Sequence, residues 1–385
     1  MIQKLFLDLV FAERSMLKNF LFLLQISFLS SCSTEAPRET YLFSKIINSD
    51  YRGLLFTARK GIHSSILYWY NFKTGIVEEI LNGQSGDPKL FLIKDKIYLF
   101  NRMGFQKNYL ILDTQNNFEL LQPEKSSFLS SGDPYFLLPI TEDYSLLSCL
   151  SEGKIKLFNL KSGVLNDLYT DNMFRPGNLI LKKDSSGKKH IYTLSLGLND
   201  FWSPDSSQKI YDFILEKNPN FTLKLQSTKK TNASYSETLF ENTMNSNELF
   251  SFSLAYEKGE SSYDRINLSN LDVTQAHDLS DLSSYEKFGS PVLTQDGFFL
   301  TPVKEKTSGE RKIKSIFFNP FKETDYHPLE RKTSSISLVY DKSNNCVFIG
   351  ENEETKNGKI HFYCGDKKVF TEEIDLDFYE GVLIP

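Results

Sequence analysis

The sequence predicts an all-β fold, a seven-bladed β-propeller of four-stranded blades whose ring is closed by the C-terminal strand. Aromatic residues make up 14% of the chain, and such residues suit a pleated, half-buried surface. Apolar runs are about four to six residues long and show no extended 3.6-residue period, which argues against a helical solenoid. A hairpin pattern recurs about every 50 residues, as expected of propeller blades.

The hairpin repeat is clearest in residues 70–80 (YNFKTGIVEEI) and 158–168 (FNLKSGVLNDL), which match in type at each position. Gly75 and Gly163 occupy the turns, where glycine readily adopts the positive φ that a tight hairpin needs. Weaker copies give seven hairpins in all, and the residues that lead into their turns are 71, 113, 159, 216, 267, 319 and 365. The mean interval is about 49 residues, so seven units fill the chain from residue 42 onwards.

A second landmark, a turn rich in glycine and proline, precedes an apolar run in several units. These turns lie at residues 86–88, 132–134, 175–177 and 289–291. Each unit is therefore predicted to contain this turn, an apolar strand, a second strand and then the hairpin. Residues 380–385 resemble the opening strand of a unit, so we expect them to complete the first blade. Residues 41–43 are the alternative partner, and a pair of β-sandwiches or an irregular all-β domain is the alternative fold.

The N-terminal residues predict export. The apolar run at 20–29 is shorter than the roughly 20 residues that a transmembrane helix needs, but it suits the apolar region of a signal peptide. It follows the single positive charge of Lys18. It ends in Leu-Ser-Ser-Cys32, which resembles the lipobox of bacterial lipoproteins. The resemblance implies that Cys32 carries lipid and becomes the mature N-terminus.

The domain boundaries follow from this assignment. Residues 1–15 are expected to be an upstream extension, with translation starting at Met16, because acidic residues lie where a positive region belongs. Residues 16–31 then form the signal peptide, 32–40 a polar tether, and 41–385 the propeller. The propeller resembles bacterial propeller lipoproteins and the wider WD40-like group in architecture, although the Gly-His and Trp-Asp signatures of WD40 repeats are absent. The resemblance implies a lipid-anchored protein of the cell envelope, on the periplasmic or surface side of the outer membrane.

The remaining cysteines predict one disulfide and one core residue. Cys346 and Cys364 lie on neighbouring strands and face each other if the hairpin between them is centred near residue 355. A disulfide is plausible in an oxidising compartment, and two buried thiols are the alternative. Cys149 lies in an apolar run and is expected to be a small core residue.

Motif searches favour no particular chemistry. Gly-x-Ser-x-Gly, His-Glu-x-x-His, Walker and Cys-x-x-Cys motifs are absent from the sequence. The histidines are far apart in sequence and fall in different units, so neither a metal site nor a cofactor is predicted. The net charge of −5, with both signs interspersed, argues against a nucleic-acid partner, which needs a basic stripe. We expect a monomer.

Two groups of residues are candidates for a binding face. Asp87, Asp133, Arg175 and Ser290 lie in the turns that lead into innermost strands, near the mouth of the central channel. The simpler interpretation is that these turns only bend the chain, with Asp bonding its own backbone. Phe201 and Trp202 lie in a long loop and are candidate aromatic anchors at an interface, or else a lid packed on the blade edge.

The sequence thus favours a membrane-anchored lipoprotein that uses its propeller as a scaffold for a protein or carbohydrate partner. The alternative is a propeller hydrolase or lyase, with Asp87 and Asp133 as acid and base at the channel mouth. A non-enzymatic role is therefore the main expectation, and catalysis is the alternative.

Overall fold

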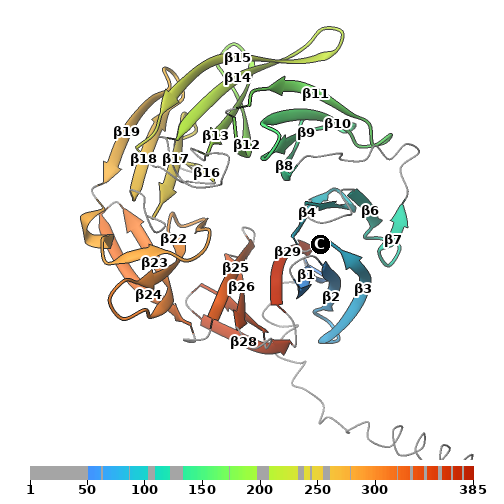
Figure 1. The fold of residues 1–385 in the computed structure, drawn as a ribbon, viewed down its shortest axis with the longest axis vertical. Coiled ribbons are helices and arrows are strands. Elements are labelled where there is room, and N and C mark those ends of the chain that lie inside the picture. Colours follow the sequence, from blue (N-terminus) through green and yellow to red (C-terminus); the bar gives the residue numbers. More distant parts are fainter. Residues whose placement is uncertain are drawn as a thin grey trace, which may run out of the picture. The chain divides into compact units, whose positions relative to one another are not determined.

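The computed structural model forms seven antiparallel sheets arranged in a ring (Figure 1). It describes residues 51–385, apart from 62–63, 86, 103–108, 122–132, 173, 197–207, 233–237, 243–244, 255–260, 278, 319, 330–332, 342–344, 354–357, 366 and 375–376. Within this part of the chain the elements are strands, apart from the short 3-10 helix η1 (Ser280–Leu282). None of the described helical residues forms a helix long and apolar enough to cross a lipid bilayer. The all-β, seven-bladed prediction is therefore confirmed.

The strands of the first four blades have the following order, from the innermost strand outwards. Blade 1 consists of β29 (Asp377–Ile384), β1 (Gly53–Gly61), β2 (Ser64–Asn71) and β3 (Ile76–Gln84). Blade 2 consists of β4 (Pro88–Ile93), β5 (Lys96–Asn101), β6 (Tyr109–Asp113) and β7 (Glu119–Leu121). Blade 3 consists of β8 (Pro134–Pro139), β9 (Tyr144–Cys149), β10 (Lys154–Asn159) and β11 (Leu165–Thr170). Blade 4 consists of β12 (Pro176–Lys183), β13 (Lys189–Ser195), β14 (Lys209–Lys217) and β15 (Phe221–Lys230).

The last three blades follow the same order. Blade 5 consists of β16 (Leu239–Glu241), β17 (Glu248–Ser253), β18 (Ser262–Asn267) and β19 (Asp272–His277). Blade 6 has an interrupted inner edge, where β20 (Tyr285–Lys287) and β21 (Val292–Leu293) both pair with β22 (Phe299–Glu305), followed by β23 (Arg311–Phe318) and β24 (Phe321–Pro328). Blade 7 consists of β25 (Thr333–Asp341), β26 (Cys346–Glu353), β27 (Gly358–Cys364) and β28 (Lys367–Ile374).

The two diagnostic hairpins owe their shape to an asparagine and a glycine. In the β2–β3 turn, Asn71 Oδ1 accepts hydrogen bonds from the backbone N–H groups of the next turn residues, at 2.9 and 3.2 Å, and Gly75 has φ of 69°. In the β10–β11 turn, Asn159 Oδ1 accepts the equivalent two bonds at 2.9 Å each, and Gly163 also has φ of 69°. Such Asx turns bend the chain locally. The same turn chemistry therefore produces the same hairpin in two blades.

The C-terminal strand closes the ring, as the sequence predicts. β29 pairs antiparallel with β1, with Val382 opposite Leu55, and it supplies the innermost strand of blade 1. Arg52 secures the closure, because its backbone N–H donates to Ile384 O at 2.8 Å and its Nε donates to Pro385 O at 2.9 Å. The alternative partner, residues 41–43, lies outside the described residues.

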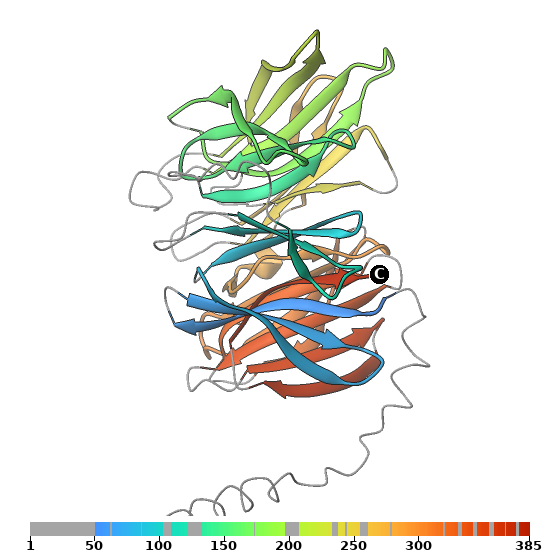
Figure 2. The ribbon, with the colours of Figure 1, turned by 90° about the vertical axis from the view of Figure 1, so that its right-hand side faces the viewer.

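The core lies between neighbouring blades, where the sheets face one another (Figure 2). Separate apolar clusters fill the seams from blade 1 to blade 7 in turn. Between blades 7 and 1, Phe348 stacks on Phe72 with ring centroids 5.6 Å apart. Burial of each such aromatic side chain stabilises the fold by about 1.5–3 kcal/mol, so the blades hold one another in place.

The cysteines behave as the register suggests. Cys346 on β26 lies opposite Cys364 on β27, and a disulfide joins them with Cα atoms 4.1 Å apart. Cys149 is a free thiol, fully buried in the cluster between blades 2 and 3.

Candidate functional site

A cavity of about 860 Å³ lies at the centre of the ring. Its wall includes residues from the innermost strands, or the turns leading into them, of all seven blades: Lys89, Tyr135, Asn178, Thr238, Ser290, Leu338 and Glu380. Small-molecule sites typically have volumes of about 300–1,000 Å³ and carry few polar groups in a mainly apolar wall. The cavity is therefore of a size to hold a small molecule.

A buried arginine joins the two carboxylates that the sequence singled out. Arg102 follows β5, and its guanidinium donates to both oxygens of Asp133, through Nε to Oδ1 and through Nη2 to Oδ2 at 3.0 Å. Its Nη1 lies 3.1 Å from Asp87 Oδ2. All three residues are buried. Burial acts to lower the pKa of Arg102, but the hydrogen bond and charge of Asp133, with the charge of Asp87, raise it above the ordinary value.

This arrangement changes the role expected of Asp87 and Asp133. The sequence placed both at the channel mouth, and the structure does bring them together, on opposite sides of one guanidinium. Asp133 and Arg102 line the cavity, whereas Asp87 is not part of its wall. A fork-shaped guanidinium held by two carboxylates is rigidly oriented. The pair therefore serves to position Arg102 at the cavity wall.

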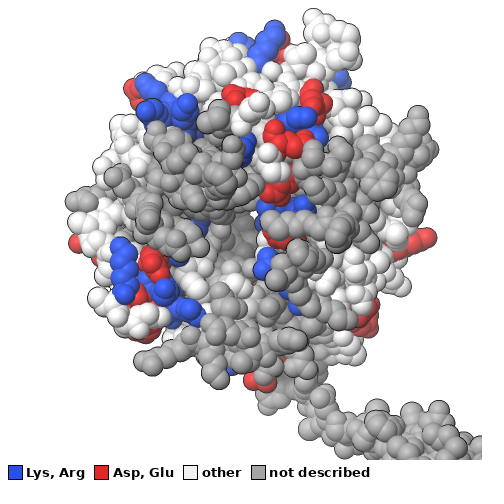
Figure 3. Space-filling model, in the orientation of Figure 1, with Lys and Arg blue, Asp and Glu red and all other residues white. Residues whose placement is uncertain are grey.

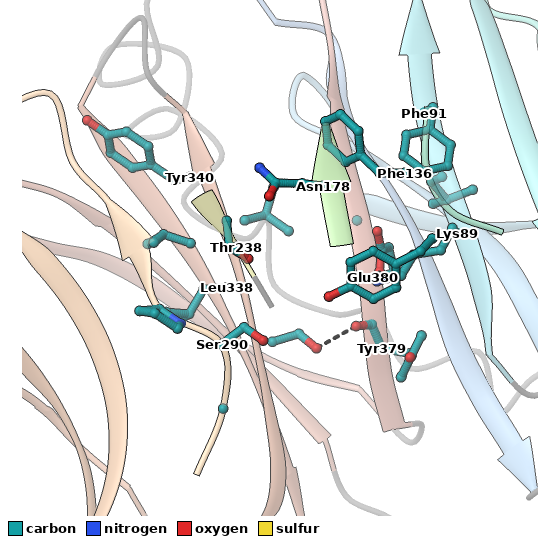
Figure 4. A pocket seen from close by; sticks show the side chains of 18 of the residues that line it. Lys89, Phe91, Phe136, Asn178, Thr238, Ser290, Leu338, Tyr340, Tyr379 and Glu380 are labelled. Atoms are coloured by element: carbon teal, nitrogen blue, oxygen red, sulfur yellow. Dashed lines mark hydrogen bonds and ion pairs between the residues drawn. The ribbon is translucent and has the colours of Figure 1, made fainter. Parts of the chain in front are cut away.

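A second ion pair faces the cavity more openly. Lys89 on β4 and Glu380 on β29 approach to 2.7 Å, and their side chains are 18% and 22% exposed. The ammonium also lies 5.4 Å from the ring centre of Tyr135 and 5.9 Å from that of Tyr379, within cation–π range. Figure 4 shows Lys89 and Glu380 next to each other beside Tyr379, with Ser290 and Thr238 elsewhere around the pocket. In Figure 3, acidic and basic atoms gather along one side of the central opening.

The other predicted residues are distributed as follows. Ser290 lines the cavity, as expected from its turn. Arg175 leads into β12, but its Nη1 donates to Asn172 O at 2.7 Å and it is not part of the cavity wall. Phe201, Trp202 and Cys32 lie outside the described residues.

Sequence reasoning missed the residues Lys89, Arg102 and Glu380. Two of them carried a usable signal, because Lys89 follows the Asp-Pro turn into an innermost strand and Glu380 lies in the predicted closing strand. The innermost strands border the channel, and residues of β4 and β29 line the cavity. No comparable sequence signal identified Arg102, because it directly follows an apolar second strand and belongs to no turn motif.

A further cluster of polar groups lies away from the channel. His327 on β24, Glu351 on β26 and His361 on β27 are all buried, and one ligand atom from each lies within 4.8 Å of the others. Histidines far apart in the sequence thus meet in space, although the sequence predicted no metal site. Burial lowers the pKa of His361, which favours the neutral ring. These three residues could hold a metal ion.

Comparison with known proteins shows the fold class. No family model and no curated protein matches the chain. Among solved structures, the periplasmic gluconolactonase of Pseudomonas aeruginosa is similar, with a TM-score of 0.58 and 10% identity over 86% of this chain and 99% of that one. A protein from Lactobacillus plantarum matches with a TM-score of 0.57 and 10% identity over 87% and 100% of the two chains. A puromycin-hydrolyzing peptidase of Mycobacterium tuberculosis matches with a TM-score of 0.54 and 11% identity, over 85% of this chain and 53% of the peptidase chain.

These similarities correct the functional prediction. The sequence favoured a membrane-anchored lipoprotein acting as a binding scaffold, but two of the similar structures are hydrolytic enzymes, so the hydrolase alternative is the better supported one. At 10–11% identity the likeness establishes a shared propeller architecture, which many unrelated activities use. It supports neither a WD40 assignment nor a lipoprotein family.

Proposed function

We propose that this chain is a hydrolase that cleaves a small polar ester or lactone in the central cavity. The observation that carries the proposal is the Lys89–Glu380 pair, at 2.7 Å and partly exposed to the cavity, beside the Arg102 guanidinium. The similarity to a gluconolactonase supports it, because a lactone is a cyclic ester. Among the described residues a cysteine nucleophile is not part of this site, since the free thiol of Cys149 is buried away from the cavity wall.

The chemistry requires a base and a stabiliser of negative charge. Glu380 takes a proton from a water molecule, whose oxygen attacks the ester carbonyl carbon. The Lys89 ammonium stabilises the oxyanion that develops on the carbonyl oxygen. Its positive charge is positioned before the reaction starts, so no reorganisation is needed in the transition state. When the carbon–oxygen bond breaks, the leaving alkoxide recovers the proton from Glu380. Water is the only co-reactant.

Arg102 serves to hold the substrate. Its guanidinium is fixed by Asp133 and Asp87 and forms part of the cavity wall, where it presents N–H donors in a fixed geometry. It also lies 5.5 Å from the ring centre of Tyr135. A substrate with a carboxylate or several hydroxyl groups fits this wall best.

The test is a hydrolysis assay of the purified full chain with glucono-1,5-lactone and p-nitrophenyl acetate, followed by acid release. General-base catalysis contributes about 10²–10⁴-fold, so Glu380→Gln and Lys89→Met are each expected to lower kcat by at least about 100-fold. The matched control is Glu216→Gln, because Glu216 forms an equally short ion pair of 2.7 Å with Lys224 on the outer β14–β15 hairpin. The proposal would be refuted if Glu380→Gln kept full activity. It would also be refuted if the wild-type protein hydrolysed neither the lactone nor the p-nitrophenyl ester.

We also propose that the chain is attached to the cell envelope through Cys32. Support comes from the lipobox-like residues 29–32 after an apolar run. In bacteria expressing the full chain, Cys32→Ala is expected to move the protein from the membrane pellet to the soluble fraction. Unchanged membrane association in that variant would contradict the proposal.

A further inference from the structure

The seam between blades 6 and 7 contains a cluster of three buried titratable side chains. His327 on the outer strand β24 of blade 6 meets Glu351 and His361 on the middle strands β26 and β27 of blade 7. Their exposed fractions are 5%, 2% and 5%. Buried polar groups in proteins are normally bonded to partners, so the partners of each atom indicate what the cluster does.

The inward-facing atoms are spaced like the ligands of one ion. Glu351 Oε2 lies 3.1 Å from His361 Nε2 and 3.9 Å from His327 Nε2, and the three atoms lie within 4.8 Å of one another. Tetrahedral zinc with bonds of about 2.0–2.1 Å separates its ligand atoms by about 3.3 Å. The Glu351–His361 distance is close to this spacing, and His327 Nε2 lies somewhat farther out.

The outward-facing atoms are fixed by a second set of hydrogen bonds. His327 Nδ1 bonds with the Tyr363 hydroxyl at 2.6 Å, and His361 Nδ1 bonds with Thr371 Oγ1 at 2.9 Å. The Thr333 hydroxyl donates to Glu351 Oε1, the carboxylate oxygen that faces away. Metal-binding histidines typically use one ring nitrogen in this way, which directs the other towards the ion.

One inward atom points to a ligand. His327 Nε2 is buried and has no hydrogen-bond partner among the residues that the structure describes. Its ring is held by Tyr363 and lies 4.5 Å from the His361 ring, centre to centre. A hydrogen-bonded network of Glu351 and His361 alone would leave this nitrogen unused.

We propose that His327, Glu351 and His361 bind a divalent transition-metal ion, zinc, which links blade 6 to blade 7. Two imidazoles and one carboxylate form a donor set that suits zinc, and a water molecule would complete the tetrahedron. The site lies outside the wall of the central cavity and does not depend on the proposed ester hydrolysis. The ligands come from two blades and are almost completely shielded from solvent, so the ion would join the blades within their seam.

Metal binding is tested on the purified full chain after dialysis against a chelator. Titration with Zn²⁺ is expected to reveal a site whose binding falls to background in His327→Gln, and Co²⁺ is expected to give the visible absorption of a four-coordinate ion. His190→Gln is the matched control, because His190 is also paired with a carboxylate, Asp212 at 2.8 Å, but it lies in blade 4 and is in no metal-ligand cluster among the residues that the structure describes. Binding in His190→Gln should equal that of the unchanged chain.

A milder variant separates a loss of metal affinity from a failure to fold. Tyr363→Phe keeps the ring but removes the hydroxyl that orients His327, and loss of such a partner typically weakens metal affinity about 10–100-fold. Zn²⁺ is also expected to raise the Tm of the unchanged chain but not of His327→Gln. Wild-type protein that takes up no Zn²⁺ at micromolar concentration, or a His327→Gln variant that binds it equally well, would overturn the proposal.

Discussion

Replacement of Arg102 by methionine is expected to destabilise the propeller by about 3–5 kcal/mol, because removal of one partner leaves buried charges uncompensated. Asp133 loses both hydrogen bonds from the guanidinium, and Asp87 keeps the more distant Arg59, at 3.8 Å. An unfolding entropy of about 2.1 cal/mol/K per residue, over roughly 335 residues, gives about 0.7 kcal/mol/K. The expected fall in Tm is therefore about 4–7 °C.

Scanning calorimetry measures this change, with two comparison variants. Lys161→Met breaks a surface ion pair with Asp143 at 2.8 Å, and exposed pairs contribute about 0–1 kcal/mol, so its Tm should fall by less than about 2 °C. In the triple variant Arg102→Met, Asp87→Asn, Asp133→Asn the carboxylate charges are gone, and most of the lost Tm should return. A single variant as stable as the original chain would refute this reasoning, as would a triple variant no better than the single one.

Three further predictions concern the ring closure and the cysteines. Phe378→Ala removes a fully buried ring that stacks on Phe56 with ring centroids 5.4 Å apart. The loss should lower the free energy of unfolding by about 3–5 kcal/mol and speed amide hydrogen exchange in β1 and β29. Unchanged exchange there would contradict the role of β29 in closing the ring. Burial raises the pKa of the Cys149 thiol to about 12, so roughly one molecule in ten thousand carries the thiolate at pH 8. Iodoacetamide should therefore label the peptide that contains Cys149 only when guanidinium unfolds the protein. Fast labelling of the folded protein would contradict the burial of this thiol. Joint replacement of Cys346 and Cys364 by serine should lower the free energy of unfolding by roughly 3 kcal/mol, measured by urea titration; an unaltered midpoint would count against a stabilising disulfide.

The fold was predictable because its unit is encoded locally. An asparagine that caps the turn and a glycine at positive φ specify the hairpin within a few residues, as in Asn71 to Gly75. The closing strand was predictable by counting, since the first unit lacked its opening strand. The cysteine pair followed from the register of one hairpin, in which Cys346 lies opposite Cys364.

The sites were only partly predictable, because their residues come from different blades. Asp87 and Asp133 were placed correctly at the start of innermost strands, but Arg102, which joins them, carries no local signal. The register of blade 7 sets Ile349 opposite His361, which brings Glu351 to the same face as His361. His327 belongs to the neighbouring blade. The strand register within one blade does not determine how that blade packs on the next one, so the sequence did not predict this contact.

The strand that closes the ring also contributes Glu380 and Tyr379 to the cavity wall. During synthesis at about 5–20 residues per second, β1 leaves the ribosome roughly 15 s to a minute before its partner β29. A nascent chain can thus assemble its middle blades early while the cavity still has a gap in its wall. Premature termination between the end of β28 and Glu380 would yield a polypeptide with the strands of blades 2 to 7 and none of the proposed catalysis.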